Sequence, residues 1–183
     1  LTDENGQQTY IDNTFGAGFD ALVTINSHRL PVVRGFLMYL TAVIQTIFCS
    51  FSPNQLKLET EKEKWEQDSL MLVLANGQRE GGGFYLSPSA RTDDGILNYT
   101  IAEHVSRPMM FRLIPEFLKG TQERFSQIKT GTFKKITVQS DTPLYIHIDG
   151  EIYTNFGSDL RGFRVEVVPN ALQIIKSPQE PSA

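Results

Sequence analysis

Short runs of alternating apolar and polar residues dominate the chain and predict β-strands. Beyond residue 53 these runs are rich in β-branched and aromatic side chains, and Gly, Pro, Asp and Asn separate them. They cover residues 56–60, 69–77, 82–87, 95–103, 134–140, 143–149, 150–156, 163–169 and 172–176. A further short strand is predicted at Thr9–Asn13. Many short strands favour a mainly β protein built as an antiparallel β-sandwich.

Two segments have helical spacing instead. In the first, apolar residues fall at 36, 37, 40, 43, 44, 47, 48 and 51, and Pro53 closes the pattern. The second begins at Ser106, a suitable N-cap, has Pro108 in its first turn and ends at Gly120, with a kink expected at Pro115. The first segment falls short of the roughly 20 apolar residues that span a bilayer. We therefore expect two helices that pack on the sandwich.

The amino-acid composition excludes some classes of protein. The 183 residues are 40% hydrophobic and 21% charged, which is typical of one globular domain, and a net charge of −4 provides no basic field for nucleic acid. Cys49 is the only cysteine, so a disulfide framework is excluded and a cytoplasmic location is expected. The chain starts at Leu1 without a leader sequence, and we expect it to be a piece of a longer protein. Residues 1–176 are predicted to form the domain and 177–183 a disordered tail.

The segment Phe15–Ala21, FGAGFDA, partly matches the dinucleotide-binding fingerprint. That fingerprint also needs a helix directly after the glycines and an acidic residue about 20 positions further on, where this chain has an apolar run. We interpret the segment as a tight glycine turn in which Asp20 bonds to nearby backbone amides.

A second glycine-rich segment covers residues 80–99. The triple glycine at 81–83 lacks the Gly-Lys-Ser/Thr of a phosphate-binding loop, so its predicted role is close passage of the backbone or a bulge entering the next strand. Asp93-Asp94-Gly95 reads as a turn from its spacing alone. The functional alternative is that Asp94 and flanking carbonyls bind a hard divalent cation, because Mg²⁺ prefers oxygen ligands.

The segment 143–153, PLYIHIDGEIY, carries the most chemistry. Alternation places Leu144, Ile146 and Ile148 on one face of a strand and Tyr145, His147 and Asp149 on the other. If the alternation survives Gly150, Glu151 joins Asp149 on the polar side. Two close carboxylates can position a divalent metal or take a proton from a hydroxyl. A solvated edge hairpin with a glycine turn explains the spacing equally well, and His147 alone does not argue for a ligand.

Taken in order, these segments resemble the C-terminal domain of the diacylglycerol kinase, sphingosine kinase and bacterial soluble lipid kinase family. The resemblance rests on Asn13, Gly16, Gly18, Phe19, Asp20 and Ala21, then on Gly81–Gly83, Pro88, Ala90, Asp93, Asp94 and Gly95, and finally on Asp149-Gly150-Glu151 and the closing segment 168–175. It covers nearly the whole chain.

The resemblance implies a two-domain kinase in which an N-terminal α/β domain binds ATP through a Gly-Gly-Asp-Gly-Thr loop and a β-sandwich closes the cleft. This chain has no such run. We therefore expect the N-terminal ATP-binding domain to be absent from it. The function implied is that of an ATP- and Mg²⁺-dependent lipid kinase that phosphorylates a hydroxyl of a diacylglycerol-like or sphingoid lipid, inactive as this domain alone.

The resemblance also implies residue roles. Asp94 would bind a structural Mg²⁺ together with the carbonyls of Arg91 and Ile96. Asp149 and Glu151 would face the ATP phosphates, and Glu151 would assist deprotonation of the lipid hydroxyl or organise a catalytic Mg²⁺. Gly81 and Gly82 would lie near the interdomain cleft, on the ATP side.

The implied partners are a lipid substrate, ATP and the N-terminal kinase domain, without nucleic acid. An apolar groove for the lipid would involve the helix at 36–51 or the segment 108–111, although core packing is the expected role of both. A transient, peripheral contact with a membrane surface and a homodimer stay open. So do two other functions: a non-catalytic ligand-binding or interaction sandwich derived from a kinase domain, and a related kinase that acts on a soluble substrate such as a nicotinamide dinucleotide.

Overall fold

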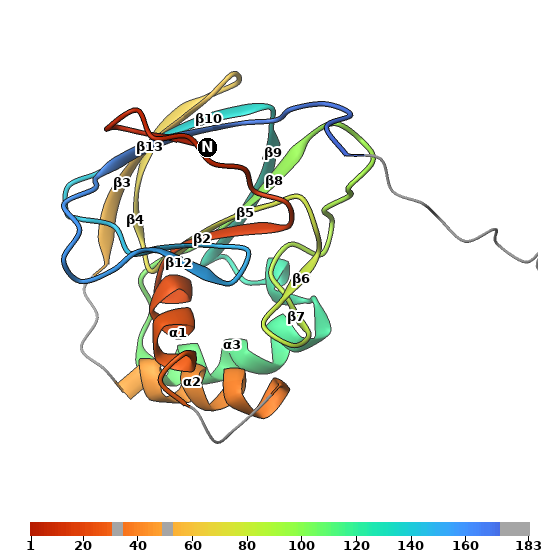
Figure 1. Ribbon diagram of the computed structural model, residues 1–183. Helices are drawn as coiled ribbons and strands as arrows, with labels where there is room; N and C mark the ends of the chain where they lie inside the picture. The colour runs from red at the N-terminus through yellow and green to blue at the C-terminus, as the bar shows by residue number, and fades with distance from the viewer. Residues whose placement is uncertain (31–34, 49–52, 173–183) are drawn as a thin grey trace, which may run out of the picture.

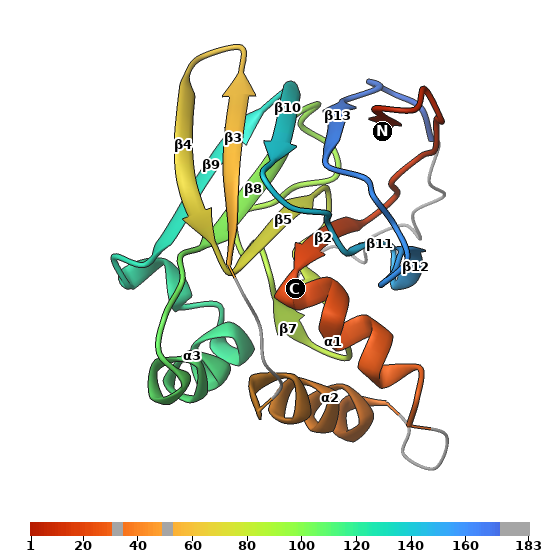
Figure 2. The same ribbon diagram turned by 90° about the vertical axis from the view of Figure 1, so that its left-hand side faces the viewer.

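The computed structural model describes residues 1–30, 35–48 and 53–172. Two antiparallel sheets stack face to face, and three α-helices cover the outer face of one sheet (Figures 1 and 2). The first sheet has the order β1 (Thr2–Asp3), β13 (Gly162–Glu166), β10 (Lys135–Ser140), β3 (Asn54–Thr60), β4 (Lys64–Ser69). The second has the order β12 (Glu151–Thr154), β11 (Ile146–Ile148), β2 (Thr14–Gly18), β5 (Met71–Ala75), β8 (Leu97–Ala102), β9 (Ile128–Phe133). The predicted mainly β antiparallel sandwich is confirmed.

Single residues connect the two sheets. Lys134 lies between β9 in the second sheet and β10 in the first, and Leu70 lies between β4 in the first and β5 in the second. Side chains from both inner faces fill the space between the sheets, among them Phe15 and Leu72 of the second sheet and Ile136 of the first. Burial of this apolar surface is the main stabilisation of a sandwich of this kind.

The second sheet is buried on both faces, and β5 shows this in its alternation. Leu72 and Leu74 point into the space between the sheets, whereas Met71, Val73 and Ala75 pack under the helices. All of β5 is therefore apolar, as expected for a strand covered on both sides.

The helical layer consists of α1 (Phe19–Ser27), α2 (Phe36–Phe48) and α3 (Arg107–Lys119), with a short 3₁₀ turn at Gln122–Arg124. The helices predicted from apolar spacing correspond to α2 and α3. Ser106 and Gly120 cap α3, and Gly120 has a left-handed φ of 72°. Buried side chains of α1–α3, including Val23, Val43 and Leu113, pack against the second sheet.

The helix α1 corrects the interpretation of FGAGFDA as a glycine turn. Thr14–Gly18 is instead a central strand of the second sheet, and α1 begins at the next residue. Gly18 has a φ of 79°, and a Cβ there would lie 2.7 Å from the carbonyl oxygen of Leu70. The glycines serve close packing at a strand-to-helix junction, which local sequence does not distinguish from a turn.

The strand predicted at Thr9–Asn13 is also wrong, because pairing begins at Thr14. Besides β2, four of the described strands were not predicted: the two-residue strands β1 and β6, the largely polar β4, and β9, which contains Gly131. β4 and β9 both lie at sheet edges, and their sequences, KWEQDS and IKTGTF, contain too few apolar residues to show an apolar pattern. The predictions for residues 173–183, most of the last strand and the tail, lie outside the described residues, as does Cys49.

A short hairpin, β6 (Arg79–Glu80) with β7 (Phe84–Tyr85), stands apart from both sheets near α2 and α3 (Figure 1). None of the helices in the described part of the chain is long and apolar enough to cross a membrane.

We expect Phe133→Ala to lower the free energy of unfolding by about 3–5 kcal/mol, because it opens a cavity among fully buried side chains. Phe133 is 0% exposed and lies against Tyr99 in the core between the sheets. Leu37→Ala is the control, since that side chain is 63% exposed and its loss should cost little. Chemical denaturation measures both; equal losses for the two variants would contradict this core.

Candidate functional site

The hairpin between β11 and β12 is a two-residue turn made by Asp149 and Gly150. Their φ angles are 52° and 85°, and Ile148 pairs with Glu151 across the turn. Both central residues therefore have the left-handed backbone conformation. Two-residue hairpin turns of type I′ require this conformation, and Asp-Gly is a preferred sequence for them. The alternation predicted through Gly150 is interrupted here, and Asp149 belongs to the turn rather than to the polar face of β11.

The Asp149 carboxylate anchors this hairpin to the start of β2. Its two oxygens accept hydrogen bonds from the backbone N–H groups of Asp12, Asn13 and Thr14 at 2.9, 2.8 and 2.9 Å. Charge-assisted bonds of this kind are stronger than neutral ones. They connect segments that lie 135–137 residues apart in sequence, so the carboxylate holds the hairpin in a defined position.

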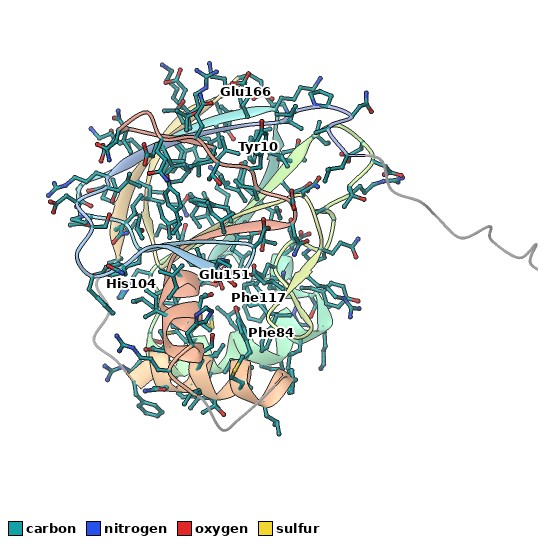
Figure 3. The ribbon with its side chains drawn as sticks, in the orientation of Figure 1. Tyr10, Phe84, His104, Phe117, Glu151 and Glu166 are labelled. Atoms are coloured by element: carbon teal, nitrogen blue, oxygen red, sulfur yellow. The ribbon has the colours of Figure 1, made fainter. Side chains whose placement is uncertain are left out.

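Glu151 is placed differently. It is the first residue of the edge strand β12, it is exposed, and its carboxylate makes no hydrogen bond to any residue that the structure describes. Figure 3 labels it where the hairpin approaches the helical layer, and α1 packs against both β11 and β12. The carboxylate is therefore available to accept a proton or to interact with a cation.

A cluster of buried polar groups lies beneath the hairpin, where β11 faces the helices. His147 on β11 places Nε2 at 2.8 Å from Oδ2 of Asp20, in the first turn of α1. The Tyr39 hydroxyl on α2 donates to Oδ1 of the same carboxylate at 2.9 Å. On the other side of the imidazole, Nδ1 lies 3.4 Å from Oε1 of Glu80, whose other oxygen accepts a hydrogen bond from the hydroxyl of Thr14. We call Asp20, Glu80 and His147 the buried triad.

Burial and mutual charge shift the protonation of the triad. Burial, followed by the charge of Asp20, raises the pKa of Glu80 from 4.5 to about 7, against the opposing effect of His147. Burial alone would lower the pKa of His147, but the charge and hydrogen bond of Asp20, with smaller effects of Glu80 and Asp149, raise it. Burial and the nearby carboxylates also raise the pKa of Tyr39 far above its ordinary value, so its hydroxyl stays a donor.

The triad exists because Gly16 leaves room for it. A Cβ at Gly16 would lie 2.1 Å from Nε2 of His147 and 2.3 Å from Oδ2 of Asp20. The sequence did not predict that these three residues meet. Its patterns indicated a turn at Asp20, gave no argument for His147 as a ligand and gave no role to Glu80. A histidine within an otherwise apolar strand was the one available signal, because no fixed spacing relates the three residues.

The triple glycine forms the turn of the β6–β7 hairpin and passes close to α2. A Cβ at Gly81 would lie 2.3 Å from the ring of Tyr39, and one at Gly82 would lie 3.1 Å from Cα of Phe36. Close passage of the backbone, one of the two roles predicted, describes this segment. The predicted contribution of Gly81 and Gly82 to ATP binding stays a prediction.

Asp94 lies in an exposed turn, away from the triad. Its Oδ1 accepts a hydrogen bond from the backbone N–H of Ile96 at 3.1 Å. The Arg91 side chain is directed to Asp93, with Nε 3.3 Å from Oδ1 of that carboxylate. An exposed carboxylate suits a hard cation that keeps several waters, so Asp94 is compatible with Mg²⁺, and the predicted site with the carbonyls of Arg91 and Ile96 stays a prediction.

An apolar cavity of about 70 Å³ lies between the helices and the second sheet. Apolar side chains from α1, α2, α3 and β5 form most of its wall, with Phe84 from the hairpin, and Asp20 and Tyr39 supply the polar groups. The cavity therefore reaches one end of the buried triad. Its volume is small beside the roughly 300–1,000 Å³ of ligand pockets, so a long apolar chain would need the helices to move apart.

The fold and the acidic hairpin define a helix-covered β-sandwich domain. Residues 13–176 match the family model described as "YegS C-terminal NAD kinase beta sandwich-like domain", and the chain belongs to that family. The predicted resemblance to the C-terminal domain of bacterial lipid and diacylglycerol kinases is thereby confirmed.

Two curated relatives and two solved structures are similar to this chain. The chain is 29% identical over 174 residues to "Probable lipid kinase YegS-like" of Stenotrophomonas maltophilia (strain K279a), covering 94% of this chain and 54% of the relative. It is 25% identical over 177 residues to "Diacylglycerol kinase" of Mycobacterium tuberculosis (strain ATCC 25618 / H37Rv), covering 96% and 55%. The chain thus spans about half the length of these relatives.

The crystal structures show the fold alone. A diacylglycerol kinase from Bacillus anthracis str. Sterne aligns with a TM-score of 0.52 at 15% identity, over 89% of this chain and 48% of that chain. Another crystal structure from the same organism aligns with a TM-score of 0.60 at 18% identity, over 88% of this chain and 52% of that chain.

Replacement of the anchoring carboxylate tests its structural role. We expect Asp149→Ala to lower the free energy of unfolding by about 2 kcal/mol, because it removes charge-assisted hydrogen bonds and leaves a left-handed residue without a side chain suited to it. Asp149→Asn should lose less, since asparagine tolerates that backbone and keeps one acceptor. Asp159→Ala, at an exposed aspartate, is the control. Urea denaturation measures the free energy of unfolding of each variant. An equal loss for Asp159→Ala and Asp149→Ala would contradict the structural role of Asp149.

The pH dependence of stability tests the electrostatics of the triad. Glu80 and His147 bind protons more tightly in the folded chain than in the unfolded one, so stability should fall as pH rises from about 4.5 to about 7 and through the raised pKa of His147. Glu80→Gln should flatten this decline, whereas Glu123→Gln at an exposed position should not. Chemical denaturation at pH values from 4.5 to 8, in the presence of a chelator, measures the free energy of unfolding against pH. If this pH dependence is the same for Glu80→Gln and the wild-type protein, the raised pKa of Glu80 is refuted.

Proposed function

We propose that this chain is the C-terminal domain of an ATP- and Mg²⁺-dependent lipid kinase that phosphorylates a hydroxyl of a diacylglycerol-like or sphingoid lipid. Family membership supports a kinase domain. The names of the relatives, a lipid kinase and a diacylglycerol kinase, support the substrate class. Because the chain spans about half of those relatives, the activity belongs to a longer protein that also contains an ATP-binding domain.

One observation carries the catalytic part of the proposal: an exposed, unpaired carboxylate on an anchored hairpin. Asp149 holds the turn through three backbone N–H groups, and Glu151 follows two residues later without a partner among the described residues. Of the two carboxylates, we assign positioning to Asp149 and chemistry to Glu151. Glu151 would accept the proton of the lipid hydroxyl, or would help to hold a Mg²⁺ ion, which would supply positive charge to stabilise the transferring phosphoryl group.

The cavity among the helices supports a lipid as the substrate. Its wall is apolar, and Asp20 and Tyr39 provide polar groups at one end, so an acyl or sphingoid chain would lie among α1, α2 and α3. The present volume of about 70 Å³ accommodates only a short part of such a chain. Substrate entry therefore involves a displacement of α2 or α3.

Exposed apolar side chains support a transient contact with a membrane surface. Leu37 and Phe48 of α2 are 63% and 66% exposed, and Phe48 lies beside Phe111 of α3. The described residues of α2 include no charged side chain, whereas α3 carries Arg107, Arg112 and Lys119. An apolar surface beside basic residues suits an anionic lipid interface. The cytoplasmic location and the homodimer stay predictions.

The metal and nucleotide assignments complete the proposal. Asp94, with the carbonyls of Arg91 and Ile96, would hold a structural Mg²⁺, and Gly81 and Gly82 would lie beside the ATP that the other domain binds. Bound Mg²⁺ would stabilise the exposed turn and neutralise the charge of Asp94. Neither assignment enters the chemical step that we give to Glu151.

The test uses the longer protein that includes the upstream ATP-binding domain. We expect Glu151→Gln to lower kcat for lipid phosphorylation on the order of 10²-fold or more, as is typical for loss of a general acid or base. The isosteric amide keeps the fold, so the melting temperature should not change. Phosphate transfer from ATP to a panel of diacylglycerols and sphingoid bases measures the rate.

Glu123→Gln, at an exposed glutamate of the 3₁₀ turn, is the matched control and should retain the wild-type rate. If Glu151→Gln also retains full activity, Glu151 is not the catalytic group. If the wild-type protein transfers phosphate to no lipid in the panel, the lipid kinase proposal fails, and the non-catalytic sandwich becomes the better description.

A further inference from the structure

We propose that the buried triad of Asp20, Glu80 and His147 is a binding site for a divalent transition-metal ion of the Zn²⁺ type. One ligand atom from each residue lies within 4.8 Å of the others. The site is distinct from the turn at Asp94, which offers only oxygen. The proposal does not depend on lipid kinase activity, because it rests on the geometry of three side chains to which the proposed reaction gives no chemical step.

The unpaired nitrogen of His147 is the first observation that points to a ligand. The side chain is 0% exposed, and its Nδ1 has no hydrogen-bond partner among the described residues. Nδ1 lies 3.4 Å from Oε1 of Glu80. Two ligands of a tetrahedral zinc ion, each about 2.0–2.1 Å from the metal, lie about 3.4 Å apart. This pair therefore has the separation of two atoms on one ion.

The charge balance is the second observation. Asp20 is 3% exposed and the Glu80 side chain 9% exposed, and no lysine or arginine in the described part of the chain forms an ion pair with either. When Glu80 is deprotonated, two buried carboxylates face one imidazole, and this excess of negative charge is costly in a medium of low polarity. A divalent cation would neutralise it.

The remaining contacts orient the ligands as metal sites require. Nε2 of His147 lies 2.8 Å from Oδ2 of Asp20, so Asp20 holds the ring while Nδ1 points toward Glu80. The hydroxyls of Tyr39 and Thr14 donate to the outer oxygens of Asp20 and Glu80. A carboxylate behind a metal-binding histidine is a recurring arrangement that fixes the ring and increases its basicity. We assign His147 and Glu80 as direct ligands and Asp20 as the orienting carboxylate.

The donor set also selects the metal. Imidazole nitrogen with carboxylate oxygen suits Zn²⁺ and neighbouring transition ions, whereas Mg²⁺ prefers oxygen ligands alone. Mg²⁺ in excess can therefore occupy Asp94 and Glu151 without filling the triad. Zn²⁺ that binds in its presence reports on the triad.

The experiment titrates Zn²⁺ into chelator-treated protein by calorimetry, in a buffer with millimolar Mg²⁺. We expect one Zn²⁺ per chain. His147→Gln and Glu80→Gln should abolish this binding, and Asp20→Asn should weaken it by about 10–100-fold, as is usual when an orienting partner is removed. His104→Gln, at an exposed histidine, and Glu151→Gln should bind as the wild-type protein does.

A second measurement covers variants that do not fold. Crystals of the wild-type protein soaked with Zn²⁺ should show an anomalous peak between Nδ1 of His147 and the Glu80 carboxylate. Absence of that peak, absence of Zn²⁺ binding by the wild-type protein, or unchanged binding by a folded Glu80→Gln variant would each overturn the proposal. Loss of kinase activity in Glu151→Gln with Zn²⁺ binding intact would leave it standing.

Discussion

Coverage of the second sheet on both faces is the constraint on which the rest of this structure depends. One face packs on the first sheet and the other on three helices, so no strand in the middle of the second sheet has a solvated side. A polar group there is shielded from water, and a buried polar group without a partner in the protein is costly. His147 meets Asp20 and Glu80 for that reason, and Gly16 is small because their side chains occupy the space beside it.

The same arrangement places the hairpin that we propose for catalysis. β11 is buried as far as Ile148, and the chain then reverses at Asp149 and Gly150, so Glu151 emerges into solvent within three residues. Asp149 secures the reversal by binding the backbone at the start of β2. A rigid turn beside an exposed acid suits phosphoryl transfer, which depends more on positioning than on covalent participation by the protein. Only Ile148 separates His147, a member of the triad, from this turn.

Much of the architecture was predictable. The period of two in β10 and β13 and the helical period in α2 and α3 identify those elements, because each buries one face or stripe. β5 is identified instead by its continuous apolar run, which is typical of a strand buried on both faces. The helix α1 was not predictable from local pattern, since Gly16 and Gly18 suggest a turn. The edge strands β4 and β9 were not predicted because they contain few apolar residues, so no alternation is visible in their sequences. The Asp-Gly-Glu segment was recognised as chemically important, but only pairing across the turn separates the role of Asp149 from that of Glu151.

The sequence by itself determined the sandwich class, the family, two of the three described helices and the acidic residues of the hairpin. These depend on periodicity and on motifs that are contiguous in the chain. Tertiary structure alone decided that Asp20, Glu80 and His147 lie together. It also decided that Gly81 packs on Tyr39 and that the Asp149 carboxylate accepts hydrogen bonds from backbone amides. Those contacts join residues that lie tens to more than a hundred positions apart, and long-range pairing of strands, which no local spacing encodes, brings them together.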